Sequence, residues 1–292
     1  MLQISFFVET WQQAEEDSIK YKSENRDNSQ LYITAYVFIV AAVSLIISDL
    51  NYYGGSAAST NLILFLDSPD IKSDHPFLWS IISAIFPFSG NIITSGYYEL
   101  FELAYWTAVK VFAYLLLPAL AVAIHPKLNF KMVGLSFDRD ASHLKIYASL
   151  FAIVFVIVTA LSFTKNFSEY YPFYTQSMRS PLDFWTWELL YAIQFFALEF
   201  FFRGFILQLT KKAMGASAII AMMLPYVMIH FGKPMPECFG AIIAGIILGT
   251  LALKTRSIWA GFLLHTSVAL SMDVASDIQK GGLNFLKMIF GF

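Results

Sequence analysis

Four ionisable side chains lie within stretches of this sequence that are otherwise apolar. Glu199 and Arg203 stand among phenylalanines and leucines, His230 closes the run ASAIIAMMLPYVMIH, and His265 lies inside SIWAGFLLHTSVALSM. An ionisable group at membrane depth is energetically expensive, so it normally faces the protein interior or a wet cavity. These four side chains are therefore the candidates for a functional site.

The glutamate and the arginine are four residues apart, which places both on one face of a helix with the glutamate in the preferred N-terminal position. Two interpretations follow. The pair is a structural ion pair that neutralises itself, since the loss of one partner would leave an uncompensated buried charge. Alternatively, Glu199 is a general base whose proton affinity is set by burial on one side and by Arg203 on the other.

The two histidines extend the second interpretation. His230 precedes the helix-stopping sequence FGKP, so it is either a capping residue or a ligand. His265 lies within an apolar helix, where its N–H must still find a partner. Together with a carboxylate, they are the ingredients of a zinc site or of a metal-free Glu/His hydrolytic site. In both, the carboxylate deprotonates a water and the imidazoles orient it or stabilise the oxyanion. The sequence contains no H-E-x-x-H pair and no G-x-S-x-G motif, which excludes the soluble zincin pattern and the nucleophile elbow.

The composition places these groups in a membrane protein. Of the 292 residues, 57% are hydrophobic and 14% charged, with a mean hydropathy of +0.60, whereas soluble domains are about 45–50% apolar and about 25% charged. A net charge of −2 gives no electrostatic case for a nucleic-acid partner. The single cysteine, Cys238, excludes an intrachain disulfide and any multi-cysteine metal site. We therefore expect an all-α polytopic membrane helix bundle that has the lipid bilayer as a partner.

Apolar runs predict seven transmembrane helices and leave an eighth ambiguous. The seven runs cover residues 31–48, 104–124, 145–163, 182–209, 216–231, 238–253 and 257–272. Residues 76–95 are interrupted by proline, glycine and polar side chains, so they either cross the membrane or form a re-entrant or interfacial segment. The distribution of lysine and arginine over the loops favours seven spans with a cytoplasmic N-terminus.

The order of these motifs resembles that of the CPBP family, the CAAX proteases and bacteriocin-processing membrane proteins also called Abi proteins, which includes the type II CAAX prenyl endopeptidases. The family's usual motifs are E-E-x-x-x-R, F-x-x-x-H and H-x-x-x-N or H-x-x-x-D. Here they read L-E-F-F-F-R at 198–203, Y-V-M-I-H at 226–230 and H-T-S-V-A at 265–269, the last preceded by T-R-S-I-W-x-G-x-x-x-H.

The resemblance implies an intramembrane endopeptidase of the CAAX-protease type that acts on a membrane-associated peptide or protein substrate. It implies Glu199, Arg203, His230 and His265 as catalytic residues. It leaves open a Zn2+ ion held by His230 and His265, because family members have been viewed both as metalloproteases and as metal-independent glutamate proteases.

Charge pattern, apolar runs and the resemblance together divide the chain into four parts. Residues 1–30 are a polar N-terminal segment without the order of a signal peptide, and residues 31–163 hold the N-terminal membrane helices. Residues 182–273 form the protease core, and residues 274–292 are a C-terminal tail. We expect the protein in a bacterial plasma (inner) membrane, since nothing in the chain indicates a eukaryotic context.

Two positions depart from the family pattern. Leu198 stands where the first glutamate, usually assigned as the water activator, is expected, and Ala269 stands where the third motif has Asn or Asp. Glu199 is then the sole motif carboxylate. In this respect the chain resembles a divergent branch of the family that carries a single glutamate. Asp273, further along the helix of the third motif, and Glu237, in the loop after the second, are candidates to replace the missing polar groups.

Two functions outside the peptidase class stay open. If Glu199 is tied up by Arg203, the chain is a catalytically inactive scaffold or a bacteriocin-immunity-type protein of the same fold. A small proton or ion transporter would use the buried charges and Lys110 as its path, although the sequence shows no internal repeat of the kind transporters usually have. Catalysis requires the glutamate and both histidines to converge, whereas histidines more than about a helix diameter apart, 10–12 Å, favour a scaffold.

Overall fold

The computed structural model describes residues 4–25, 28–66, 68, 73–77, 80, 96–137 and 142–290, and these residues form helices and connecting segments without a strand. The all-α fold class is therefore confirmed. The helices are α1 (Ile4–Glu24), α2 (Ser29–Leu66), α5 (Tyr98–Val111), α6 (Leu117–Ile124), α7 (Ser142–Ser162), α8 (Lys165–Tyr170), α9 (Pro181–Glu199), α10 (Gln208–Met214), α11 (Ser217–Met228), α12 (Met235–Thr255), α13 (Trp259–Gly281) and α14 (Leu283–Phe290). Two π-helical segments, η1 (Phe112–Leu116) and η4 (Phe200–Leu207), continue α5 into α6 and α9 into α10, and η2 (Phe130–Met132) and η3 (Ser177–Arg179) are short 3₁₀ turns.

Five helical segments in the described part of the chain are long and apolar enough to cross a membrane. They are Ser29–Asp49, Tyr98–Ile124, His143–Ser162, Pro181–Met214 and Met235–Thr255. They coincide with five of the seven predicted spans, and the chain is an integral membrane protein. The ambiguous segment, residues 76–95, lies largely outside the described residues.

The other two predicted spans are helical but differ from a simple crossing helix. α11 has 12 residues, which gives a length of about 18 Å at 1.5 Å per residue, well short of the roughly 30 Å of a bilayer core. α13 has 23 residues, but it carries His265, Asp273 and Asp277, so it falls short in apolarity rather than in length.

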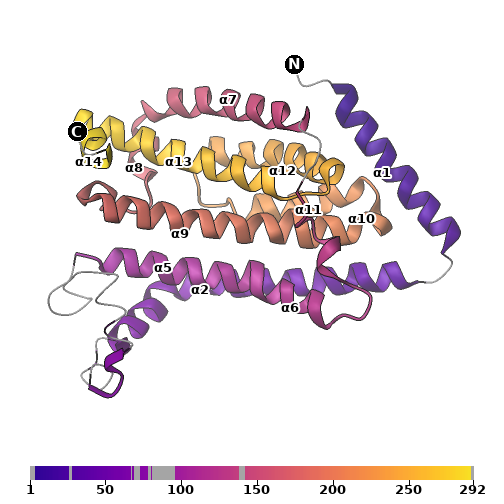
Figure 1. Cartoon of the computed structure of the whole chain (residues 1–292), viewed down its shortest axis with the longest axis horizontal. Coiled ribbons are helices and arrows are strands. Elements are labelled where there is room, and N and C mark those ends of the chain that lie inside the picture. Colours follow the sequence, from indigo (N-terminus) through magenta and orange to yellow (C-terminus); the bar gives the residue numbers. More distant parts are fainter. Residues whose placement is uncertain are drawn as a thin grey trace.

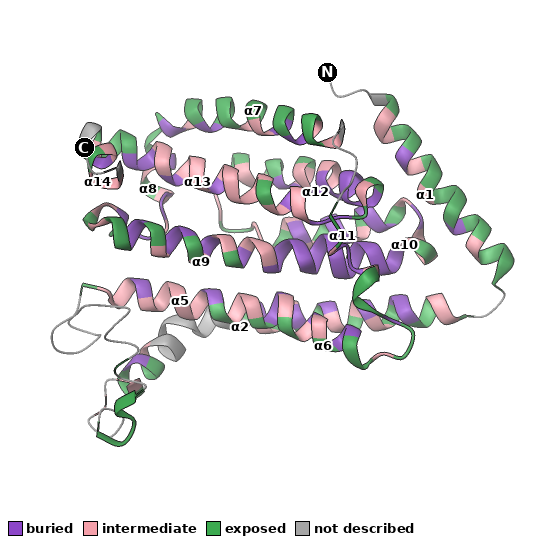
Figure 2. Ribbon diagram, viewed as in Figure 1, coloured by how far each residue is buried: buried purple, intermediate pink, exposed green. Residues whose placement is uncertain are grey.

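The segment that carries the first motif runs through the middle of the bundle. In Figure 1, α9 lies between α13 on one side and α5 with α2 on the other, and α7 covers the outer side of α13. Burial follows this order: in an apolar 18-residue stretch of each span, 67% of the residues are buried for Pro181–Met214 but 17% for His143–Ser162 in α7. Figure 2 shows the buried residues gathered toward the C-terminal end of α9 and around α11. The core therefore surrounds the first motif.

Both predicted terminal segments are helical and packed onto the bundle. In α1, the Trp11 Nε1 donates a hydrogen bond to Thr250 Oγ1 at 2.8 Å. α13 continues beyond the predicted core boundary at residue 273, because its last turns are held: Ser177 Oγ donates to Asp277 Oδ2 at 2.9 Å, and Lys280 Nζ donates to a loop carbonyl at 2.6 Å. The helix of the third motif is thus anchored at its far end.

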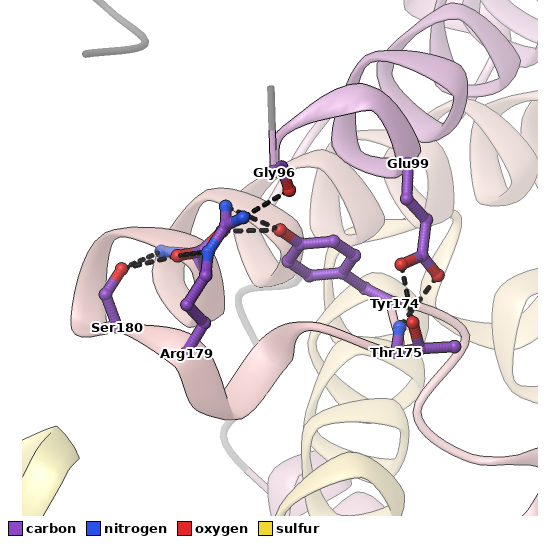
Figure 3. Close-up of polar contacts among 7 residues, drawn as sticks. Gly96, Glu99, Tyr174, Thr175, Arg179 and Ser180 are labelled. Atoms are coloured by element: carbon purple, nitrogen blue, oxygen red, sulfur yellow. Dashed lines mark hydrogen bonds and ion pairs between the residues drawn. The ribbon is translucent and has the colours of Figure 1, made fainter. Parts of the chain in front are cut away.

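Polar contacts fix the start of α9 (Figure 3). Ser180 caps the helix by accepting a hydrogen bond from the backbone N–H of Asp183 at 3.2 Å. The Arg179 Nε donates to Asp183 Oδ2 at 3.0 Å. Glu99, in the first turn of α5, accepts bonds from the N–H and the hydroxyl of Thr175 at 2.8 and 2.6 Å. This network ties α5 to the loop before α9 and so anchors the start of the helix that ends at the first-motif glutamate.

Candidate active site

The glutamate and arginine of the first motif lie where the helix changes geometry. α9 ends at Glu199, and the following π-helical segment η4, which holds Arg203, is buried throughout. A π segment inside an α-helix is rare and is frequently found at functional sites. The predicted pairing nevertheless forms, with Arg203 Nη1 lying 3.0 Å from Glu199 Oε1. The exposed fractions of the two side chains are 0% and 1%, so the ion pair is fully desolvated.

This ion pair leaves hydrogen-bonding capacity unused. Glu199 Oε2 and the guanidinium nitrogens of Arg203 make no hydrogen bond of good geometry within the described part of the chain. The guanidinium is instead held by an aromatic face, with its Cζ 4.1 Å from the centroid of the Tyr226 ring, a cation–π contact. Buried polar atoms without partners require an explanation, and a functional role is one of the recognised ones.

His265 reaches the same carboxylate from α13. Its Nδ1 lies 2.6 Å from Glu199 Oε1, and its Nε2 lies 2.9 Å from the Tyr226 hydroxyl. An ionised carboxylate can only accept, so Nδ1 carries the hydrogen, and Nε2 of the neutral imidazole accepts from the hydroxyl. Phe195 stacks on the ring at a centroid distance of 5.5 Å. The side chain retains 15% exposure, which makes it the accessible member of the pair.

A glycine on α13 permits this contact. A Cβ built on Gly261 would lie 2.7 Å from Glu199 Oε2, closer than side chains tolerate. Gly204, within η4, is similarly required, since a Cβ there would lie 2.7 Å from the Val133 carbonyl oxygen. The two glycines allow a loop and α13 to approach the first motif closely.

The close approach yields a first prediction. Gly261→Ala should displace the Glu199 carboxylate from His265 and destabilise the protein by about 1–3 kcal/mol, the usual cost of overpacking a well-packed core. The measurement is thermal unfolding of the purified protein in detergent, alongside the activity proposed below. Gly240→Ala is the matched control, because no atom lies within 4 Å of a Cβ at Gly240 on α12. Equal unfolding temperatures for the two variants would contradict the packing argument.

His230 contacts the same tyrosine. Its Nδ1 donates to the backbone carbonyl of Tyr226 at 2.7 Å, one helical turn back. The His230 and His265 rings lie 4.8 and 6.1 Å from the Tyr226 ring, centroid to centroid. The structure therefore brings Glu199 and His265 into direct contact and places His230 beside them through Tyr226.

The two carboxylates considered as replacements are engaged elsewhere. Asp273 is buried and accepts a hydrogen bond from Trp187 Nε1 at 2.7 Å, because its turn of α13 faces an earlier part of α9. Glu237 pairs with Lys233 and accepts a hydrogen bond from the Tyr171 hydroxyl. These contacts hold the loop before α12 against the loop after α8, so both carboxylates have structural partners.

The two residues that depart from the family pattern, Leu198 and Ala269, are both buried in apolar clusters. Leu198 is 4% exposed and belongs to the main apolar core, and Ala269 is 5% exposed in a second cluster with Trp187 and Tyr191. Sequence reasoning missed the roles of Tyr226 and Gly261. The available signals were a tyrosine in place of the phenylalanine of the second motif and a glycine four residues before His265.

The predicted zinc ligands are not arranged as a ligand set. Within residues 4–290, apart from the gaps in the description, no three His, Cys, Asp or Glu side chains are grouped so that they could hold a metal ion. Both ring nitrogens of His265 are in hydrogen bonds, to Glu199 and to Tyr226, and His230 uses Nδ1 for a carbonyl. These residues do not fit a His/His/Glu zinc site in this arrangement.

Comparison with known families matches residues 180–271 to the family described as type II CAAX prenyl endopeptidase Rce1-like. The match covers about a third of the chain, from the cap of α9 into α13, and it contains all four candidate side chains. No curated protein and no solved structure matches the chain.

Proposed function

Because residues 180–271 match the family described as type II CAAX prenyl endopeptidase Rce1-like, we propose that this chain is an intramembrane endopeptidase that hydrolyses a peptide bond with water activated by Glu199 and His265. The substrate is a membrane-associated peptide or protein. The observation that carries the proposal is the 2.6 Å contact between His265 Nδ1 and Glu199 Oε1 at a buried carboxylate.

The contact assigns a role to each residue. A carboxylate on one ring nitrogen fixes the tautomer of an imidazole and stabilises the imidazolium that forms when the other nitrogen takes a proton. Glu199 therefore acts as a base through His265, and Arg203 holds the carboxylate ionised and in place. Water then adds across the peptide bond, and the imidazolium returns the proton to the leaving amine.

His230 fits the role of orienting the water. Its Nδ1–H donates to the Tyr226 carbonyl, so Nε2 of the neutral imidazole keeps its lone pair. That lone pair can accept the second hydrogen of the attacking water. The burial of the surrounding helices keeps bulk water away from this step, which strengthens each electrostatic contact.

The activity test uses the full-length protein in liposomes. The probes are a farnesylated peptide ending in a CAAX sequence, the same peptide without the lipid, and a transmembrane peptide, with products identified by mass spectrometry. Cleavage of a membrane-bound probe at one peptide bond is the expected result. No cleavage of any probe by the folded protein would overturn the proposal and favour the scaffold.

The donor arrangement leads to a prediction about metal. We expect less than one equivalent of zinc per chain in the purified protein, and we expect cleavage to survive a zinc chelator, because both ring nitrogens of His265 are hydrogen-bonded, to Glu199 and to Tyr226. The measurements are elemental analysis and the cleavage rate with and without chelator. One equivalent of zinc, with activity lost on chelation and restored by zinc, would instead assign His230 and His265 as metal ligands.

A catalytically inactive relative of the same fold is the second candidate. It is favoured by the apolar residues Leu198 and Ala269 at motif positions and by the complete burial of the Glu199–Arg203 pair. An immunity-type or scaffold role would then rest on the bundle surface rather than on this site. The family match argues against the transporter.

A further inference from the structure

The Tyr226 hydroxyl is a polar group in contact with the imidazole of His265 that the motif comparison does not account for. It lies 2.9 Å from Nε2, the nitrogen that must take a proton if His265 is the base. The usual second motif of the family that the chain resembles has phenylalanine at this position, whereas this chain has tyrosine. It accompanies the loss of the first-motif carboxylate at Leu198.

We propose that Tyr226 is a further catalytic residue, whose hydroxyl relays the proton from the attacking water to His265; this rests on the proposed function. The water gives a proton to the Tyr226 oxygen while the Tyr226 proton moves to Nε2. The hydroxide so formed bonds to the peptide carbonyl carbon. In the reverse relay, the imidazolium returns one proton through Tyr226 to the amine as the C–N bond breaks. Atoms and charge balance without any further reactant.

Three features of the structure support the relay. Tyr226 is 2% exposed as a whole, but its hydroxyl contacts the imidazole of His265, a side chain that retains 15% exposure. The Arg203 guanidinium stacks over the Tyr226 ring at 4.1 Å, and this positive charge stabilises negative charge that builds on the phenol oxygen during transfer. Glu199 completes the chain by accepting from Nδ1.

The position also explains why the relay is needed here. With Nε2 already bound to the hydroxyl, a water can reach the base through Tyr226 rather than by direct contact. The alternative water activator of the family, the first glutamate of E-E-x-x-x-R, is absent because Leu198 occupies its position in the apolar core. The hydroxyl therefore supplies the polar contact to water that the first motif lacks.

The test compares Tyr226→Phe with wild type in the full-length protein. The variant restores the family's own residue, so folding should be retained. General acid–base contributions are typically about 10²–10⁴-fold, and we expect a loss of kcat at the lower end of that range with KM within about twofold. The matched control is Tyr36→Phe, which removes a hydroxyl that donates to the Ala121 carbonyl at 3.0 Å, and its kcat should not change.

Two further measurements separate a relay from a structural role. In mixtures of H2O and D2O, the wild-type rate should fall along a curve, because two protons move together, and any residual rate of Tyr226→Phe should fall linearly. The ¹⁵N resonance of His265 Nε2 should shift in the variant as its donor is lost. An active wild type with an equally active Tyr226→Phe variant overturns the relay alone, whereas equal rates for wild type and a His265 variant overturn the proposed function.

Discussion

Replacing His265 with glutamine should lower kcat for peptide hydrolysis by about 10²–10⁴-fold, the usual contribution of a general acid–base residue. Glutamine is close to histidine in length and can donate a hydrogen bond toward Glu199, which Nδ1 now contacts at 2.6 Å, but it cannot take up a proton. The fold should therefore survive while the chemistry is lost. The measurement is the rate of probe cleavage in liposomes, with unfolding followed in parallel.

His125→Gln is the matched control, because His125 lies at the end of α6 and accepts a hydrogen bond from the Lys127 N–H, away from the candidate site. Its activity should equal that of wild type. A His265→Gln protein that cleaves at the wild-type rate would remove His265 from the mechanism, and with it the role given to Glu199.

Replacing Arg203 with methionine should destabilise the protein by about 3–5 kcal/mol, the cost of leaving one member of a buried ion pair uncompensated. Both side chains are essentially unexposed, so no solvent can replace the lost guanidinium beside Glu199. The measurement is the free energy of unfolding in mixed micelles. Lys165→Met is the control: its pair with Glu169 is 84% and 63% exposed, and exposed pairs contribute little.

The double variant Glu199→Gln, Arg203→Met separates stability from chemistry. With both charges removed, much of the stability lost in Arg203→Met should return, since an apolar replacement of a whole buried pair is often neutral or stabilising. Peptidase activity should be lost in the double variant, because no carboxylate remains at position 199 to support His265. A double variant as unstable as the single one would contradict the view that the uncompensated charge causes the loss.

Much of the fold could be read from the sequence because lipid imposes a simple rule on it. A spanning segment must satisfy its backbone internally, so long apolar runs become helices. This rule predicted five segments that the structure also shows to be long and apolar enough to span, whereas α11 is shorter and α13 is less apolar than those five.

The sequence by itself determined which side chains are candidates and that Glu199 and Arg203 pair, because a spacing of four residues survives even the change into η4. Only the tertiary structure decided that His265 bonds this glutamate and that Tyr226 joins it to His230. Contacts between helices depend on the depth and rotation of each helix. Those are fixed by close approaches such as that of Gly261, by the π-helical turn and by the anchored ends of α9 and α13, none of which has a local periodicity in the sequence.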